Sequence, residues 1–420
     1  MKVVLVNTND TGGGAAIACR RLLSAHVKNG VDVKMLVRTK NSKDNYIEST
    51  THNGIKRLRN NFNFLYERLG FIAIESSKDV RFAFSSANIG EDISDNKLIK
   101  EADLIHLHWV NQGFISLQGI DKLLKLNKPV VWTLHDMWAF TGGCHYSGTC
   151  LNYGENCGNC YFLDKPSEND ISAKIWNKKK SLYENKNITF VTCSNWLKET
   201  AKRSTLLKDF RIESIPNPID TDKFSPGVHE RLVEKLNLSL CKKYILFGAA
   251  NVNDKRKGLN YFIEALNILN NRHPESVYKV ELLVFGKSVG DIFNELPYKL
   301  NNMGVMKSQK EIAEIYSVSN LFVLPSIEDN LPNTIMESLA CGTAVVAFNT
   351  GGIPEMIENG VNGYLAEYKS SESLADNIYK VLFESDSELL CRNARDKVMS
   401  TYTESNVSNK YLDLYNEIIK

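Results

Sequence analysis

The sequence shows no long hydrophobic run, no signal-like apolar start and little excess of charge of either sign. No stretch approaches the ~18 consecutive apolar residues that a membrane-spanning helix needs. The apolar start, MKVVLV, turns polar at Asn7, short of the ~7–15-residue core of a secretory signal. Lysine and arginine number 51 against 49 aspartates and glutamates, for a net charge of +2. We therefore expect a cytoplasmic chain with no transmembrane helix and no nucleic-acid partner.

The apolar content is nevertheless high enough for two hydrophobic cores. Of the 420 residues, 43% are hydrophobic and 10% are aromatic, which excludes global disorder. Domains of roughly 100–200 residues make two the expected number. Nine cysteines are an odd number for a disulfide framework, so they indicate thiols or a metal site.

Short apolar runs alternate with amphipathic segments along the chain, as expected for parallel strands that helices bury on both faces. The pattern restarts after a segment that holds Pro216, Pro218 and Pro226, and closely spaced prolines stiffen a linker. We predict an α/β protein with two doubly wound, Rossmann-like domains, residues 1–215 and 227–403, joined by a linker at 216–226. The final helix, residues 404–420, could pack back on the first domain. The predicted strands are residues 2–6, 31–37, 104–108, 130–134, 189–193, 244–247, 280–285, 321–324 and 344–348.

The most informative stretch, residues 325–367, follows a predicted strand and leads into a helix. Ligands of open α/β sheets bind at the carboxyl ends of strands, and Pro332 suits a first helical turn. Free N–H groups at a helix start favour an anion such as a diphosphate. Further along the helix, the carboxylate of Glu337 can hold a ribose diol through two hydrogen bonds. Gly351 and Gly352 then allow a close approach of backbone to a ligand.

This stretch resembles the signature of glycosyltransferase family 4, retaining enzymes of the GT-B fold, whose two Rossmann-like domains face each other across a cleft. The family pattern is an acid, seven residues and a glutamate, followed by an Ala-Cys-Gly-like turn and a later Gly-Gly-Ile-Pro-Glu. Here Glu337 is the second acid, and Asp329 stands where the family usually has glutamate, with Glu328 beside it as the alternative. The resemblance implies that Glu337 binds the nucleotide ribose and that the first acid binds hydroxyls of the donor sugar. The donor-binding segment that it implies also includes Asn330, Leu331, Asn333 and Thr334.

Two further segments carry the resemblance. NDKRKGLNYFIEAL resembles the family's phosphate-binding lysine segment and places Lys257 on the donor diphosphate, where an ammonium can neutralise the leaving group. The family often has an arginine several residues earlier, but residues 249–251 read Ala-Ala-Asn, and Arg256 could take that role. TGGGAAIACRRLL resembles the glycine-rich first loop, in which Gly13 and Gly14 would let backbone approach donor phosphate or acceptor.

Histidines stand near the carboxyl ends of two predicted strands in the first domain. His135 follows a strand in VVWTLHDMW, where the family carries a histidine near the reacting sugar, so the implied role is to bind a donor-sugar hydroxyl. Asp136 could orient His135. His106 and His108 alternate along ADLIHLHW and share one face. We expect His108, nearer the strand end, and Asp136 to lie on the acceptor side; the alternative for each histidine is a packed structural residue.

Four of the nine cysteines cluster directly after the His135 motif in the spacing C-x5-C-x6-C-x2-C. Four thiolates can close a tetrahedral zinc site, and C-x2-C is a usual half-site, so we predict a structural zinc, with disulfides or free thiols as alternatives. His145 could replace one ligand. We expect no catalytic metal, because the Asp220-Thr221-Asp222 triplet lies in the proline-rich linker. The four cysteines are Cys144, Cys150, Cys157 and Cys160.

Residues 55–74 form a basic amphipathic pattern. A helix of this kind can lie in the interface of an anionic membrane, and the alternative is a helix packed on the first domain. The basic residues are Lys56, Arg57, Arg59 and Arg68, and the apolar residues at spacings of three and four are Ile55, Leu58, Phe62, Leu65, Leu69 and Ile72.

The resemblance implies a retaining glycosyltransferase that moves a sugar from a nucleotide-sugar donor, a UDP- or GDP-sugar, to a saccharide or lipid-linked acceptor in surface polysaccharide biosynthesis. The second domain would bind the donor and the first the acceptor. Two alternatives stay open, a nucleotide-sugar epimerase of the same fold and a non-catalytic protein that binds sugar nucleotides. We expect the protein in the cytoplasm, with a possible peripheral contact at the inner face of the membrane.

Overall fold

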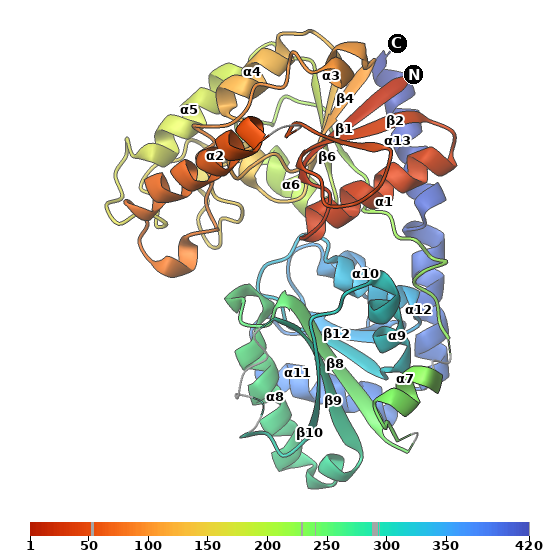
Figure 1. The fold of residues 1–420 in the computed structure, drawn as a ribbon. Helices are drawn as coiled ribbons and strands as arrows, with labels where there is room; N and C mark the ends of the chain where they lie inside the picture. Colours follow the sequence, from red (N-terminus) through yellow and green to blue (C-terminus); the bar gives the residue numbers. More distant parts are fainter. Residues whose placement is uncertain (52–53, 228–229, 240, 288–292, 294, 420) are drawn as a thin grey trace. The chain divides into compact units, whose positions relative to one another are not determined.

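The structure is a computed structural model of the full chain, and it describes residues 1–51, 54–227, 230–239, 241–287, 293 and 295–419. The chain divides into two compact units (Figure 1). The first unit comprises Met1–Asn217 and Val407–Lys420, and the second comprises Pro218–Asn406. The division falls inside the proline-containing segment of the sequence, and the last helix returns to the first unit. Throughout the described ranges, no helix has the length and apolar content that crossing a bilayer takes.

The first unit is built on a parallel sheet of seven strands in the order β3-β2-β1-β4-β5-β6-β7. Its central strands are almost wholly buried apolar runs, because helices cover both faces. The order reverses between β1 and β4, so the carboxyl ends of these two strands mark the position where open α/β sheets bind ligands. The strands are β1 (Lys2–Asn9), β2 (Asp32–Thr39), β3 (Ile47–Ser49), β4 (Leu104–Leu107), β5 (Val130–Leu134), β6 (Ile188–Thr192) and β7 (Ile212–Ser214).

Alternate residues of these strands enter two separate cores. Val3 and Leu5 of β1 face the core that α1 and α13 cover, whereas Val4 and Val6 face the core that α4 and α5 cover. Apolar and aromatic residues of the last helix, among them Tyr411, pack in the first of these cores. The helices of the first unit are α1 (Gly14–Lys28), α2 (Gly54–Ile72), α3 (Lys97–Glu101), α4 (Leu117–Leu124), α5 (Ile171–Tyr183), α6 (Asn195–Lys202) and, from Val407 on, α13 (Glu404–Ile419).

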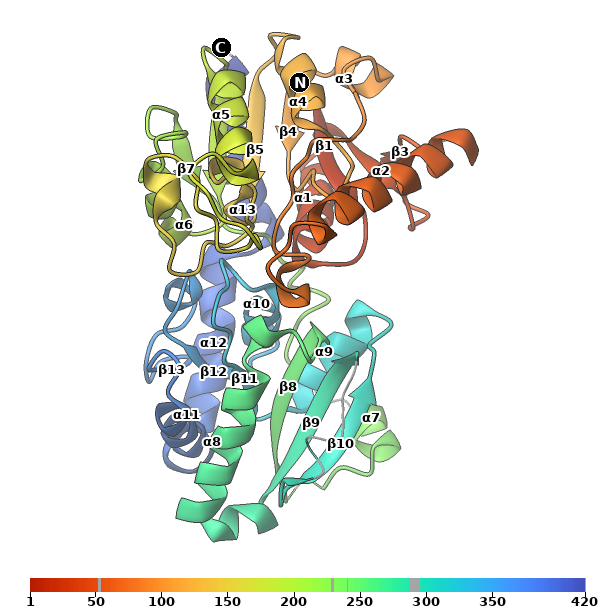
Figure 2. The ribbon, with the colours of Figure 1, turned by 90° about the vertical axis from the view of Figure 1, so that its left-hand side faces the viewer.

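The second unit is built on a parallel sheet of six strands in the order β10-β9-β8-β11-β12-β13. Helices α8 and α11 pack together on one face, and α9 and α10 lie on the other (Figures 1 and 2). The strands are β8 (Lys243–Asn251), β9 (Val280–Lys287), β10 (Lys299–Gly304), β11 (Leu321–Leu324), β12 (Ala344–Phe348) and β13 (Gly363–Ala366). The helices are α7 (Glu230–Lys235), α8 (Leu259–Arg272), α9 (Gln309–Val318), α10 (Asn333–Ala340), α11 (Ser371–Tyr379) and α12 (Ser387–Thr401).

Side-chain caps fix where many of these helices begin. Ser116, Ser194 and Asp170 each accept a hydrogen bond from a backbone N–H of the first turn of α4, α6 and α5. Ser308 and Glu311 form a complete capping box at α9. Helices α1 and α10 differ, because their N-cap residues, a glycine and a proline, provide no side-chain cap in the described structure. The N-cap side chain therefore does not occupy the first N–H groups of these two helices.

Candidate functional site

The loop after β11 is held between two neighbouring loops of the second unit. The Ile327 N–H donates to the carbonyl of Arg256 at 2.8 Å, and the Gly352 N–H donates to the carbonyl of Asp329 at 3.3 Å. At Gly351, φ is +58°, and a Cβ built there would lie 1.8 Å from the Asp329 oxygen. Only glycine therefore permits this approach at position 351, whereas the predicted approach of Gly351 and Gly352 to a ligand stays a prediction.

Gly258 plays the same part on the other side of the loop. Its φ is +70°, and a Cβ there would lie 1.9 Å from the carbonyl oxygen of Pro325. This glycine follows the short 3₁₀ turn Lys255–Lys257, which Asp254 caps by accepting from the Arg256 N–H. The two glycine contacts bring the lysine segment and the acidic loop together at the carboxyl ends of β8, β11 and β12.

Lys257 and Asp329, which the sequence assigned to diphosphate and donor sugar respectively, form an ion pair. Nζ of Lys257 lies 2.6 Å from Oδ2 of Asp329, and both side chains are mostly shielded from water. Arg256 is more exposed, and its guanidinium pairs with Asp254 at 2.8 Å. Of the two candidate first acids, Asp329 contacts the predicted phosphate-binding lysine directly.

Helix α10 begins directly after this loop. Pro332 is its N-cap residue, one position before the first turn in which the sequence placed it. The first turn carries no acid that would repel an anion. Two hydroxyls beside it, Ser326 Oγ and Thr334 Oγ1, are buried and have no hydrogen-bond partner within the described part of the chain. Buried polar atoms normally have a partner, so these hydroxyls are suited to a ligand.

The remaining predicted donor residues line the same segment. Glu337 lies one turn into α10 and is buried. Glu328, Asn333 and Thr334 are partly exposed, whereas Asn330 and Leu331 are buried. The segment therefore presents polar groups at the start of α10.

In the first unit, a row of imidazoles runs toward the carboxyl end of the sheet. Nδ1 of His108 lies 3.0 Å from Nε2 of His135, and the two rings stack at 5.3 Å. The ring of His106 lies 4.3 Å from that of His108. Nδ1 of His106 is 2.6 Å from the hydroxyl of Tyr415, and its Nε2 is 2.7 Å from Oγ1 of Thr133. The strand histidines are thus joined to helix α13 by hydrogen bonds.

Burial keeps these rings neutral. It lowers the pKa of His135 to about 4, with Asp136 opposing the shift, and it lowers the pKa of His106 and His108 well below the ordinary value. His135 is nevertheless partly exposed to water. A neutral, accessible imidazole can exchange a hydrogen bond with a sugar hydroxyl and carries no charge at pH 7.

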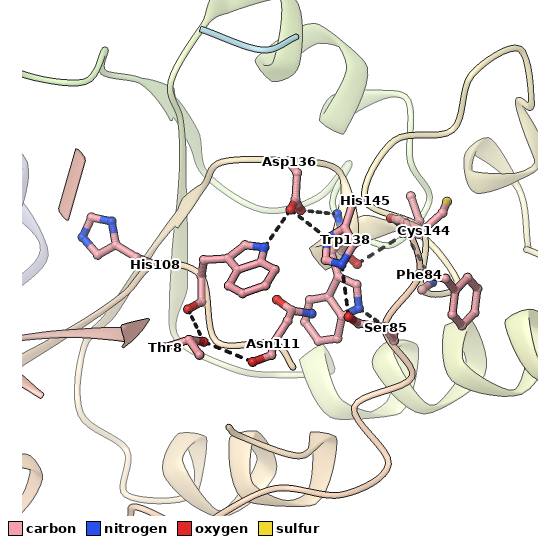
Figure 3. A network of polar contacts seen from close by, with 12 residues as sticks. Thr8, Phe84, Ser85, His108, Asn111, Asp136, Trp138, Cys144 and His145 are labelled. Atoms are coloured by element: carbon pink, nitrogen blue, oxygen red, sulfur yellow. Dashed lines mark hydrogen bonds and ion pairs between the residues drawn. The ribbon is translucent and has the colours of Figure 1, made fainter. Parts of the chain in front are cut away.

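Asp136 organises the loop that follows β5 (Figure 3). Its carboxylate accepts from the indole of Trp109 at 2.8 Å, from the Trp138 N–H at 2.9 Å and from His145 at 2.8 Å. Burial acts to raise the pKa of Asp136, but His145 and these hydrogen bonds outweigh it and hold the pKa below its ordinary value. The other ring nitrogen of His145 contacts Ser85 at 3.1 Å. Both nitrogens of His145 are therefore engaged in this structure, and its role as a substitute zinc ligand stays a prediction.

The glycine-rich loop lies between β1 and α1. Gly12 and Gly13 have φ of +78° and +83°, and a Cβ on either would meet no atom within 4 Å. Positive φ favours glycine, and the open space leaves room for another molecule beside the backbone. Gly14 is the first residue of α1. Gly13 and Gly14 thus stand at a helix start that carries no side-chain cap.

The four clustered cysteines are free thiols in this structure. Within the described ranges, no group of three or more His, Cys, Asp or Glu side chains is placed to hold a metal ion. Burial raises the pKa of Cys157 to about 11 and that of Cys160 to about 12, and the neighbouring thiols add to both shifts. The thiols therefore lie near one another, but the zinc site stays a prediction.

A buried lysine that the sequence pattern did not reveal supports this region. Lys179 of α5 is fully buried, donates to the carbonyl of Thr141 at 2.9 Å and to that of Trp138, and lies 3.6 Å from the centre of the Trp138 ring. Burial lowers its pKa to about 7. In the sequence it stands among three consecutive lysines, so no local signal distinguished it from a solvated charge.

Two parallel-sheet, Rossmann-like units with this loop and helix arrangement define the GT-B fold. Solved structures agree: sucrose-phosphate synthase from Thermosynechococcus elongatus matches with a TM-score of 0.67 at 17% identity, over 99% of this chain and 98% of that one. WaaG, a glycosyltransferase involved in lipopolysaccharide biosynthesis, matches with a TM-score of 0.63 at 14% identity, over 98% and 99% of the two chains. At these identities the likeness establishes the fold.

The sequence places the chain in a family. The model of Glycosyltransferase Family 4 matches residues 12–223, and that of Glycosyl transferases group 1 matches residues 242–384. The chain belongs to glycosyltransferase family 4, as its motifs indicated.

Two curated relatives are glycosyltransferases with named substrates. The UDP-Gal:alpha-D-GlcNAc-diphosphoundecaprenol alpha-1,3-galactosyltransferase of Escherichia coli is 25% identical over 59% of this chain and 65% of its own length. The N,N'-diacetylbacillosaminyl-diphospho-undecaprenol alpha-1,3-N-acetylgalactosaminyltransferase of Campylobacter jejuni is 29% identical over 48% of this chain and 53% of its own length. The chain thus spans less than two thirds of the length of these relatives. Neither relative is an epimerase or a non-catalytic binding protein.

Proposed function

We propose that the protein is a retaining glycosyltransferase that transfers a sugar from a nucleotide-sugar donor to a saccharide or lipid-linked acceptor in surface polysaccharide assembly. The observation that carries the proposal is the meeting of Lys257 and Asp329 at the start of α10. A lysine, a helix N-terminus and two buried hydroxyls without partners in the described ranges form a chemically suitable seat for a diphosphate.

In the proposed reaction, the bond between the sugar and the donor diphosphate breaks while the acceptor hydroxyl attacks on the same face of the sugar. Lys257 and the N–H groups of α10 stabilise the charge that develops on the leaving diphosphate. The departing phosphate oxygen takes the proton of the acceptor hydroxyl, so no protein nucleophile is required. Glu337 holds the ribose, and Asp329 holds hydroxyls of the donor sugar. His135, neutral at pH 7, contributes a hydrogen bond to a sugar hydroxyl.

The donor and acceptor classes follow from the relatives. The E. coli relative is named for UDP-Gal and a diphosphoundecaprenol acceptor, and the HepE protein of Anabaena, a structural neighbour with a TM-score of 0.64, was solved with UDP-glucose. We propose a UDP-sugar as donor, with a GDP-sugar as the alternative, and a saccharide on a lipid diphosphate as acceptor. Because such a lipid is embedded in a bilayer, the proposed enzyme meets its acceptor as a peripheral protein at a cytoplasmic membrane surface.

The test is transfer with defined substrates. Purified protein is incubated with labelled UDP- and GDP-sugars, with and without saccharide diphosphate lipids, and NMR reads the anomeric configuration of the product. We expect transfer with retention, abolished or strongly reduced in Glu337→Gln and unchanged in Glu388→Gln, whose carboxylate is exposed on α12. Epimerised sugar without acceptor would support the epimerase instead. The absence of turnover, together with no thermal stabilisation by any nucleotide, would overturn the proposal.

A further inference from the structure

Helix α2 has the reverse of the usual orientation of an amphipathic helix. Its buried side is mostly polar and includes Glu67, which is only 4% exposed, whereas most of its apolar residues face outward, with Ile55 81% and Leu58 72% exposed; Phe71, at 3%, packs in the core. A surface helix ordinarily turns its apolar stripe to the core. The exposed apolar side chains are Ile55, Leu58, Phe62, Leu65, Tyr66, Leu69 and Ile72, and we call them the outward face.

Specific contacts hold the helix in this orientation. Oε1 of Glu67 accepts from the Ala87 N–H at 3.0 Å, and the guanidinium of Arg68 donates to the carbonyl of Phe84 and to Oγ of Ser85, both at 3.3 Å. A Cβ on Gly113 would lie 2.7 Å from the backbone of Asn63, so loop and helix are in close contact. Rotation of α2 about its axis would break all of these contacts.

This orientation is unfavourable in water on both sides of the helix. Buried polar atoms of Asn60, Asn63 and Glu67 have no hydrogen-bond partner within the described ranges, and such atoms destabilise a fold. At the same time, the outward face stays hydrated, although burial of apolar surface is the main favourable contribution to folding. The arrangement is explained if the outward face leaves water in the working state of the protein.

The charge around the outward face identifies what covers it. Lys56, Arg57 and Arg59 are exposed at the start of α2, and Glu67, the single acid of this fully described helix, is buried. Just beyond the helix, Phe82 is also exposed. Within α2, the exposed apolar side chains are interspersed with cations and no acid is exposed, a combination that is complementary to a lipid interface with anionic headgroups.

We propose that the outward face of α2 docks on an anionic lipid bilayer, with the apolar side chains at the level of the acyl chains and the basic residues at the headgroups. The proposal rests on the proposed function, because a lipid-linked acceptor is presented at such a surface. It adds the residues that make the contact and the orientation of the first unit: α2 lies along the membrane, with its buried side toward the loops at residues 84–87 and 113.

Flotation with vesicles of phosphatidylglycerol and phosphatidylcholine, compared with phosphatidylcholine alone, tests the docking. We expect the wild-type protein to float with the anionic vesicles and less so at high salt. The triple variant Leu58→Glu, Phe62→Glu, Leu65→Glu should bind about tenfold more weakly or worse. Arg57→Gln and Arg59→Gln should each weaken binding about fivefold at low salt. The matched controls are Tyr278→Glu and Leu151→Glu, which change side chains that are 77% and 71% exposed elsewhere.

Two further measurements keep the outcomes distinct. Thermal unfolding of the triple variant should match the wild type, because its changed side chains are exposed. The triple variant should also still transfer sugar to a short-chain, water-soluble acceptor in the absence of vesicles, because this reaction needs no membrane. If the wild type itself shows no transfer to this acceptor, the result contradicts the proposed function and does not bear on the docking. Wild-type protein that does not float, or a triple variant that floats equally well, overturns the docking. If the wild type is a dimer and the triple variant is a monomer, the docking on lipid is also overturned, because the outward face then binds a second copy of this chain.

Discussion

Replacement of Gly351 by alanine should damage the donor site through backbone geometry alone. At φ +58°, a non-glycine residue costs about 1–2 kcal/mol. The new Cβ would lie 1.8 Å from the Asp329 oxygen, whereas real Cβ contacts essentially never fall under 3.0 Å. The loop that carries Asp329 must therefore move by more than about 1 Å, a displacement that can cost about 100-fold in rate.

The chain offers a control with almost the same backbone conformation. Gly304 has φ +62°, and its added Cβ would meet no atom within 4 Å. Gly304→Ala should therefore show the conformational cost alone, a fall in melting temperature of about 2–4 °C for each kcal/mol in a unit of this size. Gly351→Ala should show a larger fall, and in addition a loss of about 100-fold in kcat/KM for the donor.

The assay is thermal unfolding of both variants together with steady-state kinetics on the donor. If Gly351→Ala and Gly304→Ala shift the melting temperature equally and both keep wild-type kcat/KM, the contact between Gly351 and the loop does not position the site. A loss of stability without a loss of activity would equally refute the argument, because it would mean that the displaced loop does not bind the donor.

Three other perturbations have defined outcomes. Glu337→Ala should weaken donor binding, whereas Lys257→Ala should lower kcat more than it changes KM, each by on the order of 3 kcal/mol; wild-type kinetics for both would contradict the site. The first unit should lose stability as the pH falls from about 6.5 to about 4, because the unfolded chain binds protons at His135 and at His26, a buried histidine of α1, while burial holds the folded pKa of both at about 4. For each histidine, the free energy of unfolding should fall by about 1.4 kcal/mol per pH unit over the range in which only the unfolded chain is protonated. A free energy of unfolding that does not change between these pH values argues against the neutral histidines. If the four thiols of residues 144–160 bind zinc, protein purified without chelator should contain about one zinc per chain by elemental analysis. A zinc content below about a tenth of that, with all four thiols reacting freely, would contradict the predicted zinc site.

The sequence predicted the fold well where a segment is buried on both faces. Three predicted strands, at 130–134, 321–324 and 344–348, have the same bounds in the structure, because a continuous apolar run has one stable place in a doubly wound sheet. The apolar pattern predicts no strand at β3, β7, β10 or β13, which lie at or near the sheet edges. Strand β10, KLNNMG, has no strongly buried residue and is polar enough to read as a loop.

The candidate site was predictable in its residue types and less so in its contacts. Glycines at 351 and 352 stood out because the motif placed them next to the ligand, and the structure adds a different constraint, the approach of Gly351 to the backbone of Asp329. The role of Asp136 was not predictable: its partners Trp109 and His145 come from a different strand end and from a loop, and only the folded chain brings them to one carboxylate. The sequence singled out the basic and apolar pattern of α2, but its inverted orientation depends on tertiary contacts made from the polar side of the helix.

The ion pair between Lys257 and Asp329 links two roles that the sequence assigned separately. The two charged groups lie 2.6 Å apart. Each therefore neutralises the other at a position shielded from water, where an unpaired charge would be costly. A diphosphate that binds Lys257 must weaken this pair, and Asp329 is then released to accept hydrogen bonds from sugar hydroxyls. We infer that binding of the nucleotide part prepares the acid that binds the sugar part. A nucleoside diphosphate should therefore bind Asp329→Asn at least as tightly as the wild type, while the intact nucleotide sugar binds it more weakly, and calorimetric titrations of both ligands into both proteins measure the difference. Equal losses for the two ligands would show that Asp329 serves the diphosphate site and not the sugar.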